Sequence, residues 1–354
     1  RVIKISKIQG TPIIIEIDRN NQIIGYENNE LKQVGDYFLH GAHACKYLKL
    51  PNLEQVGNLF LASNSTLEQL ELPKVKSVGT FFLYSDQNLN GLKMPNLEQV
   101  GESFLTYNES LIHVKFPNLK YVAENFLQYN QRLSHLKLPN LSQVGDNFLF
   151  YNERLLEIDL PNLELVGNNF LFNSKVLKQL KLPRIKEAGN NFLYNNQGLT
   201  QLEILNLEQV GDAFLLSNNS LRKLRLPSLK KAGDDFLCCN QCLDQVDILN
   251  LEQAGDYFLY RNNELRRLKL PKLQSIGNKF LLSNKNLCQL ELPNLPEVRN
   301  KFSHIIDRNN RKVDSKIIAQ VDKDSRLTNS DIVTASDVIK DIKALPQKRS
   351  EDEK

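Results

Sequence analysis

The stretch LEQLELPKVKSVGTFFLYSDQN, residues 67–88, decides the fold because its pattern returns throughout the chain. A phenylalanine recurs every 22 residues from Phe38 to Phe302, at thirteen positions without a slip. A glycine keeps the same spacing from Gly35 to Gly277, and only Ala123 interrupts it. Such a fixed period is typical of a solenoid, in which each unit buries its apolar face against its neighbours.

Each part of the unit has a structural role. Leu70 and Leu72 alternate with polar residues, which predicts a strand that is half-buried on one face. Pro73 ends the strand because it has no N–H to donate to a ladder. Gly79 is predicted to occupy a turn with unusual backbone dihedrals, and Phe82 to fill the interior. The pattern therefore predicts one short strand and one turn in every unit.

The repeats predict twelve parallel strands, the first near Cys45 and the last starting at Leu287. An asparagine also recurs in the turn of most units, where its side chain is predicted to hydrogen-bond the loop backbone from inside. This asparagine column comprises Asn64, Asn108, Asn130, Asn152, Asn196, Asn218, Asn240, Asn262 and Asn284.

The stretch from Asn64 to Pro73, followed by Val78-Gly79 and Phe82, resembles the BspA-like bacterial class of leucine-rich repeats. A unit of that class runs N/C-x-x-L-x-x-I-x-L-P and continues with I-G-x-x-A-F. The match covers about residues 31 to 303, and this chain differs by its uniform 22-residue unit and by a leucine after the phenylalanine. The resemblance implies an α/β leucine-rich-repeat solenoid with a parallel sheet on its concave face.

Three regions follow along the chain. Residues 1–30 contain β-branched runs around a turn at Asp18–Asn21 and are predicted to form an N-terminal β cap. Residues 31–303 are the solenoid, and residues 304–354 are a polar C-terminal tail with one amphipathic helix at about 330–345. Capping the last repeat, docking a partner and remaining loose are all compatible with this helix.

Composition narrows the function classes. A net charge of +4 is too small to indicate a nucleic-acid binder, and no apolar run approaches the roughly 18 residues of a membrane helix. Five cysteines are an odd number in a chain too large to need a disulfide framework, which indicates a reducing compartment. The sequence contains no phosphate-binding loop, G-x-G-x-x-G, H-E-x-x-H or G-x-S-x-G motif, so no enzyme activity and no cofactor are expected.

One cysteine cluster, Cys238-Cys239-Asn240-Gln241-Cys242, requires a separate interpretation. A zinc site would need further ligands, and the nearby strands offer only Cys288, two repeats further on. Cys238 occupies a column filled elsewhere by Tyr84, Phe150, Phe172, Tyr194 and Tyr260. The favoured interpretation is that the cluster fills a semi-buried slot, with a metal or redox site as the alternative, and no metal is expected.

The outward strand positions form a column of charges. From Lys137 onward the sign alternates at every strand, which predicts a cross-strand charge ladder on strands about 4.8 Å apart. The alternation fails where three lysines follow one another. The column reads Lys49, Glu71, Lys93, Lys115, Lys137, Asp159, Lys181, Glu203, Arg225, Asp247, Lys269 and Glu291.

The repeats around this failure carry the candidate partner-binding site, because lysine, histidine, tyrosine and apolar groups on one surface are typical of an interface centre. Chance variation among tolerated surface residues is the alternative. A metal site of the two histidines and the glutamate is disfavoured, because ligands on three successive strands form a row rather than converge on one ion. The candidate residues are Lys93, Lys115, Lys137, His113, His135, Glu157, Ile112, Leu156, Tyr107, Tyr129 and Tyr151.

These features predict a non-enzymatic, monomeric protein-interaction module that binds a protein with an acidic surface on its concave repeat face. The resemblance implies a bacterial protein. The composition, rich in asparagine and lysine, and the end at Glu351–Glu353 are similar to virulence effectors that intracellular pathogens secrete into the host cytosol. A bacterial cell-surface adhesin and the recognition domain of a larger enzyme are the alternatives.

Overall fold

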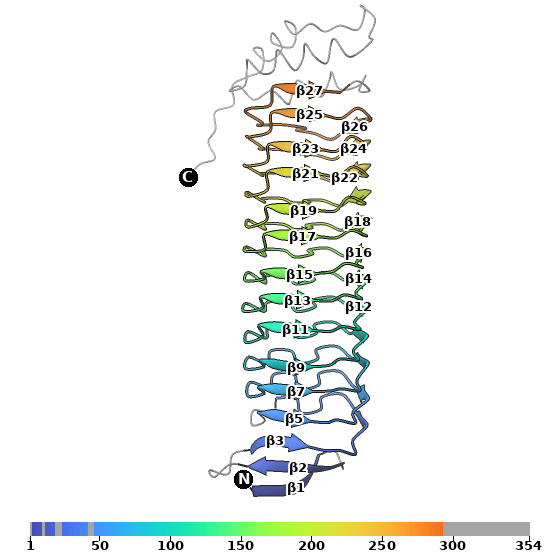
Figure 1. The fold of residues 1–354 in the computed structure, drawn as a ribbon, viewed down its shortest axis with the longest axis vertical. Coiled ribbons are helices and arrows are strands. Elements are labelled where there is room, and N and C mark those ends of the chain that lie inside the picture. Colours follow the sequence, from blue (N-terminus) through green and yellow to red (C-terminus); the bar gives the residue numbers. More distant parts are fainter. Residues whose placement is uncertain (1, 9–10, 18–22, 42–45, 293–354) are drawn as a thin grey trace, which may run out of the picture.

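The structure is a computed structural model that describes residues 2–8, 11–17, 23–41 and 46–292, with side chains from residue 25 onward. Throughout these residues the secondary structure consists of strands β1 to β27, without a helix. The chain winds into turns that stack as one column, with the N-terminal strands at one end (Figure 1). The parallel-strand solenoid predicted from the 22-residue period is confirmed.

One wall of the column consists of twelve three-residue strands, as the L-x-x-L-x-L pattern predicts. The strands stack in chain order but divide into several short sheets. Within each sheet these strands pair in parallel and in register, so that Val114 of one strand lies beside Leu136 of the next. We call the outward side of this wall the strand face. Its strands are β5 (Tyr47–Lys49), β7 (Gln69–Glu71), β9 (Gly91–Lys93), β11 (His113–Lys115), β13 (His135–Lys137), β15 (Glu157–Asp159), β17 (Gln179–Lys181), β19 (Gln201–Glu203), β21 (Lys223–Arg225), β23 (Gln245–Asp247), β25 (Arg267–Lys269) and β27 (Gln289–Glu291). No ladder joins β9 to β11, β15 to β17, β19 to β21, or β23 to β25.

A second wall of two-residue strands stands where an α/β repeat would place its helix. These strands pair in sequence order into one continuous parallel sheet of twelve. These strands were not predicted from the sequence, because two residues are too few to show an alternating pattern. They are β4 (Gln33–Val34), β6 (Gln55–Val56), β8 (Ser77–Val78), β10 (Gln99–Val100), β12 (Tyr121–Val122), β14 (Gln143–Val144), β16 (Leu165–Val166), β18 (Glu187–Ala188), β20 (Gln209–Val210), β22 (Lys231–Ala232), β24 (Gln253–Ala254) and β26 (Ser275–Ile276).

At the N-terminal end, β1 (Val2–Ile8), β2 (Thr11–Ile17) and β3 (Ile23–Glu27) form an antiparallel arrangement. β3 then pairs in parallel with β5, which joins this arrangement to the first turn of the solenoid. The tail predicted for residues 304–354, with its helix, lies outside the described residues.

The phenylalanine column lies at the centre of the core. From Phe60 to Phe280 each ring of the column is fully buried. Phe148 stacks on Phe126 at 5.4 Å and on Phe170 at 5.3 Å between ring centroids, with interplanar angles of 4° and 5°. Because each turn places its ring on the previous one, the 22-residue period gives one continuous stack.

The asparagine column forms a buried hydrogen-bond ladder along the same stack. The backbone N–H of Asn130 donates to Oδ1 of Asn152 at 3.2 Å, and Nδ2 of Asn130 donates to the Leu105 carbonyl at 2.9 Å. The predicted bonding of loop backbone is confirmed, and most of these bonds join successive turns rather than close one turn on itself. Each such asparagine satisfies backbone groups that the interior hides from water.

Glycine is required in the glycine column for a different reason from the predicted one. The φ of Gly79 is not positive, so the prediction of unusual dihedrals at this residue was wrong. A Cβ on Gly79 would instead lie within 2.3 Å of Asn58 Oδ1, so glycine is needed because the neighbouring turn approaches closely. Left-handed backbone follows shortly after it, at Phe81 with φ 56° and Leu83 with φ 51°.

Candidate functional site

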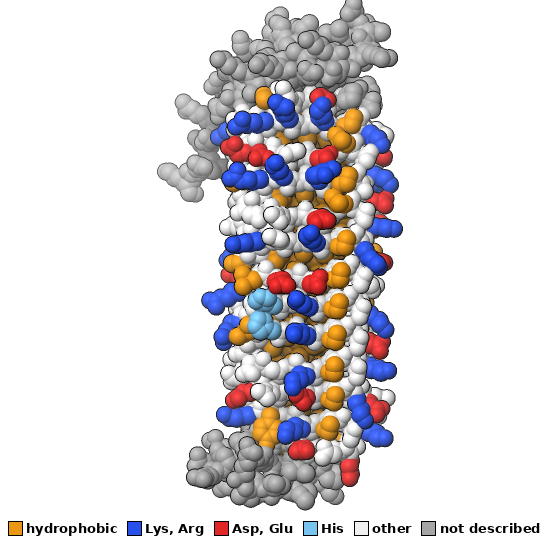
Figure 2. Space-filling view, viewed as in Figure 1, with side chains coloured by type: hydrophobic (Ala, Val, Ile, Leu, Met, Phe, Trp, Pro, Cys, Tyr) orange, Lys and Arg blue, Asp and Glu red, His pale blue; other side chains and the backbone are white. Residues whose placement is uncertain are grey.

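The candidate residues on the strand face lie on adjacent strands. β11 and β13 place His113 beside His135 and Lys115 beside Lys137. β15 continues both rows with Glu157 and Asp159. The histidine pair lies between a column of basic side chains and flanking hydrophobic side chains (Figure 2). We call this surface the strand-face patch, and it comprises Lys93, Ile112, His113, Lys115, His135, Lys137, Leu156 and Glu157.

The charge ladder predicted from Lys137 onward is confirmed from Lys181, whereas Lys137 pairs with Glu157 of the neighbouring row instead of Asp159. From Lys181 onward each basic residue of the column reaches a carboxylate on the next strand, and both side chains are exposed or half-buried. Exposed pairs of this kind contribute at most about 1 kcal/mol each. The pairs are Lys181–Glu203 at 3.1 Å, Arg225–Asp247 at 3.2 Å and Lys269–Glu291 at 2.7 Å.

The three successive lysines are not equivalent. Lys93 forms an ion pair with Glu71 on the strand before it. Lys137 turns to Glu157 in the neighbouring row, at 3.4 Å. Among the described residues, Lys115 is the one lysine of the three without an ion pair. Of the three lysines predicted to be uncompensated, only Lys115 lacks an ion pair among the described residues, so the unpaired positive charge of the patch lies at Lys115.

The two histidines contact each other beside this lysine. Their ring centroids are 4.9 Å apart, and Ser134 Oγ lies 2.8 Å from Nδ1 of His135. In the described part of the chain no group of three or more histidine, cysteine, aspartate or glutamate side chains is placed to hold a metal ion. The two rings lie side by side and can offer polar ring edges to a ligand from the middle of the patch.

Apolar side chains flank the histidines on the strand face. Leu156 is 55% exposed, the largest exposure among the leucines that the structure describes as exposed, which also include Leu165, Leu205 and Leu249. Ile112, two repeats away in the same column, is half-buried. Since burial of exposed apolar area is the main favourable term in protein association, these two residues can anchor a partner beside the charged groups.

The three tyrosines form a separate strip in the turns that precede these strands. Tyr107 stacks on Tyr129 at 4.8 Å and Tyr129 on Tyr151 at 5.4 Å. Burial raises the pKa of the Tyr129 phenol, and the neighbouring phenols raise it further. We call these three residues the tyrosine strip. Among the described residues, its ring contacts are with other aromatic rings, and none joins it to the strand-face patch.

The tyrosine strip is part of a longer row of aromatic rings that the sequence analysis did not assign to the site. Tyr151 stacks on Phe172 at 5.6 Å, and Phe172 stacks on Tyr194 at 4.5 Å. On the other side Tyr84 meets Tyr107 edge to face at 5.6 Å. The sequence did contain a signal for this row. Aromatic residues such as Tyr84, Phe172 and Tyr194 recur in the column that Cys238 occupies in a later turn.

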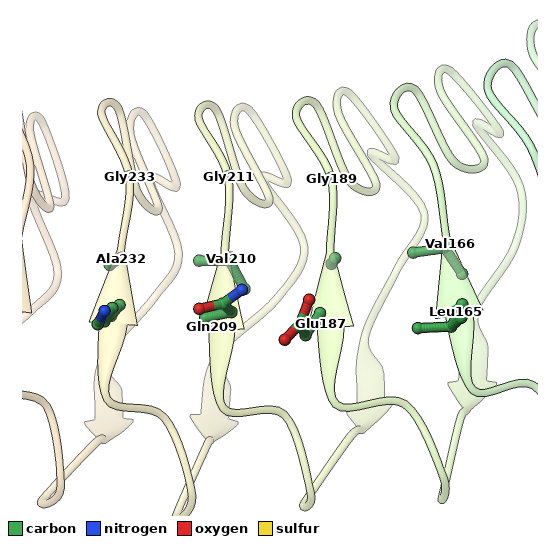
Figure 3. A pocket seen from close by; sticks show the side chains of 11 residues that line it. Leu165, Val166, Glu187, Gly189, Gln209, Val210, Gly211, Ala232 and Gly233 are labelled. Carbon is green, nitrogen blue, oxygen red and sulfur yellow. The ribbon is translucent and has the colours of Figure 1, made fainter.

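The second wall carries an open groove of about 530 Å³ over β16 to β22. Its floor is formed by small residues such as Ala188 and Ala232, and Leu165 and Glu187 project from successive strands beside it (Figure 3). Lys231 brings the opposite charge to the same rim. The groove therefore carries both a carboxylate and an ammonium group at its rim.

No helix among the described residues is both long and apolar enough to span a membrane. The family model for the BspA type leucine-rich repeat region matches residues 23–134 and 142–261 in six copies, which is more than half of the chain. The search of curated proteins found no match.

Several solved structures are similar to this chain. A leucine-rich repeat protein from Bacteroides ovatus is 16% identical, with a TM-score of 0.48, and the match covers 87% of this chain and 97% of that one. A leucine-rich cell surface protein from Faecalibacterium prausnitzii is 12% identical, covering 85% and 97%, with a TM-score of 0.41. The pneumococcal vaccine antigen PcpA is 13% identical, covering 81% of each chain, with a TM-score of 0.41.

Proposed function

Because the chain belongs to the BspA-type leucine-rich-repeat family, we propose that it is a non-enzymatic module that binds an acidic protein partner on its strand-face patch. The observation that carries the proposal is Lys115, a basic residue left without an ion pair in a column that is otherwise paired through most of its length. A carboxylate of a partner would complete this column. The same charge would attract an acidic surface from a distance.

The surroundings of Lys115 supply what an interface needs besides charge. Leu156 and Ile112 offer apolar area, and the histidine pair offers hydrogen-bonding groups beside it. The tyrosine strip provides rigid rings in the adjoining turns, and tyrosine is enriched among residues that dominate binding energy. The proposal applies equally to a host cytosol and to a bacterial surface, the two settings that the resemblance implies, because it rests on the charges of the strand face.

Reversing two charges of the patch, Lys115→Glu with Lys137→Glu, is expected to weaken binding at least tenfold, which is about 1.4 kcal/mol. The reversal replaces attraction for an acidic partner by repulsion at the centre of the interface. Titration calorimetry with a partner purified on the intact chain measures the change. Added salt should weaken binding to the wild type and have less effect on the variant, because salt screens the attraction.

A matched control reverses two basic residues of the same column outside the patch, Arg225→Glu with Lys269→Glu. This variant has the same net charge and loses two exposed ion pairs, so it should remain folded and bind within about threefold of wild type. Circular dichroism melts check both variants for folding. If the control abolished binding while the patch variant bound normally, the partner would lie at the other end of the strand face.

A further inference from the structure

Two adjacent thiols are in contact in the turn before β23. Sγ of Cys238 lies 3.1 Å from Sγ of Cys239. Cys238 is 5% exposed, whereas Cys239 is half-buried. In the repeat register Cys239 occupies the column of Tyr107, Tyr129 and Tyr151, and Cys238 the column beside it. The equivalent residues are Leu216 and Ser217 in the turn before and Tyr260 and Arg261 in the turn after, so this turn carries thiols in both columns.

Backbone hydrogen bonds from both neighbouring turns hold the two cysteines in place. The N–H of Cys239 donates to the Tyr260 carbonyl at 2.8 Å, and the N–H of Ser217 donates to the Cys238 carbonyl at 3.0 Å. Cys239 has φ 63°, in the left-handed region, as have the equivalent residues of other turns. The stack thus fixes the backbone of both cysteines, and the two thiols contact each other from this fixed backbone.

We propose that Cys238 and Cys239 are an oxidation site that closes to a vicinal disulfide when the protein meets a peroxide. A disulfide requires the sulfurs to approach to about 2.05 Å, and two sulfurs already in contact have only a short distance to move. This inference is independent of the partner-binding proposal.

The two cysteines have distinct parts in the reaction. Cys239 is the more accessible sulfur, so it attacks one oxygen of hydrogen peroxide and becomes a sulfenic acid, with release of one water. Cys238 then attacks the Cys239 sulfur, the S–S bond forms, and the sulfenic oxygen leaves as a second water with the Cys238 proton. Two thiols give up two electrons and two hydrogens, and one peroxide is reduced to two waters.

The environment of Cys238 supports this order. Burial raises the pKa of the Cys238 thiol, and the adjacent Cys239 thiol raises it further. A buried, protonated thiol is a poor first nucleophile for peroxide, because the thiolate is the reactive form. It remains well placed to react with an oxidised sulfur that it already touches. The disulfide would also fix the turn that carries Asn240, whose Nδ2 donates to the Leu237 carbonyl at 2.8 Å.

Peroxide treatment of the full chain, alkylation in denaturant and mass spectrometry test the site. No lysine or arginine lies between Lys231 and Arg261, so Cys238, Cys239 and Cys242 share one tryptic peptide and variants must assign the bond. We expect this peptide to lose two hydrogens and to carry one alkyl group, on Cys242. A thiol reductant should reverse the loss.

Serine variants separate the possible bonds. Cys242→Ser and Cys288→Ser should keep the loss of two hydrogens, whereas Cys239→Ser and Cys238→Ala should abolish it. Alanine at residue 238 keeps the buried site apolar, and in that variant dimedone should trap the sulfenic acid on Cys239. A bond that includes Cys242 or Cys288, or oxidation to sulfinic acid without any disulfide in the wild type, would overturn the proposal.

Discussion

Replacing Phe148 by alanine is expected to destabilise the protein by about 3–5 kcal/mol, because it opens a cavity in the centre of the core. The Phe148 ring is fully buried and stacks on Phe126 and Phe170, at 5.4 and 5.3 Å. Neither neighbour can fill the space without leaving its own position in the stack. Urea melts followed by circular dichroism measure the change in the free energy of unfolding.

Phe150→Ala is the matched control, since it removes the same side chain from the same turn. Phe150 is half-buried in the outer aromatic row, where water can fill the space that it leaves. We expect a clearly smaller loss, of about 1–2 kcal/mol. Hydrogen exchange should also accelerate in the turns of Phe126 and Phe170 for Phe148→Ala, because each repeat packs only on its neighbours. A loss below about 1 kcal/mol for Phe148→Ala would show that the column is not the core.

The second large effect is expected at Asp86, which occupies the asparagine column. Its side chain is fully buried, and among the described residues neither carboxyl oxygen has a hydrogen-bond partner. Burial raises the pKa of Asp86 to about 9, against a smaller opposing effect of the Asn64 backbone. An asparagine here could also accept from the Asn64 N–H, and unlike a carboxylate it could donate to the Leu61 carbonyl, as Asn130 does in the equivalent bonds two turns further on.

Asp86→Asn is therefore expected to stabilise the protein, by an amount that depends on pH. The pKa of Asp86 is higher in the folded chain than its ordinary value of 3.8, so the folded state binds the proton more tightly. The wild type thus loses stability as pH rises from about 4 towards 9, by up to roughly 1.4 kcal/mol per pH unit. We expect a gain of about 2–4 kcal/mol at pH 7 and of less than about 1 kcal/mol at pH 4.

The reverse substitution in the same ladder, Asn196→Asp, is the control. Asn196 donates to the Leu171 carbonyl at 2.8 Å and accepts from the Ser174 N–H at 3.0 Å. An aspartate there should destabilise the protein at pH 7, and the stability of the variant should recover as pH falls. Thermal melts of both variants between pH 4 and pH 9 give the comparison. Equal effects of Asp86→Asn at the two ends of this range would mean that Asp86 is charged in the folded protein.

Much of the fold could be predicted from the sequence because the period itself carries the information. Phe82 and its equivalents could only face inward once their spacing was known, and the strands followed from alternating residues such as Leu70 and Leu72. The second wall was missed because a strand such as Ser77–Val78 is too short to show alternation. The reason for Gly79 was missed because contact with the neighbouring turn is not visible within one repeat.

The sequence predicted which residues of the candidate site lie side by side on neighbouring strands, but not which ion pairs their side chains form. In-register parallel strands place Lys115 beside Lys137 whatever their side chains do. A lysine can reach a carboxylate on either side, however, and only the structure shows that Lys93 and Lys137 both turn away from Lys115. The extension of the tyrosine strip to Phe172 and Tyr194 likewise depends on ring positions that a column of residue types does not fix.

Hydrogen-exchange mass spectrometry of the complex with a purified partner tests most directly whether the strand-face patch binds it. The proposal predicts slower exchange on partner binding in β11, β13 and β15 and in the turns of the tyrosine strip, and unchanged exchange in β21 to β27. Protection confined to the groove over β16 to β22, or to the far end of the strand face, would contradict it.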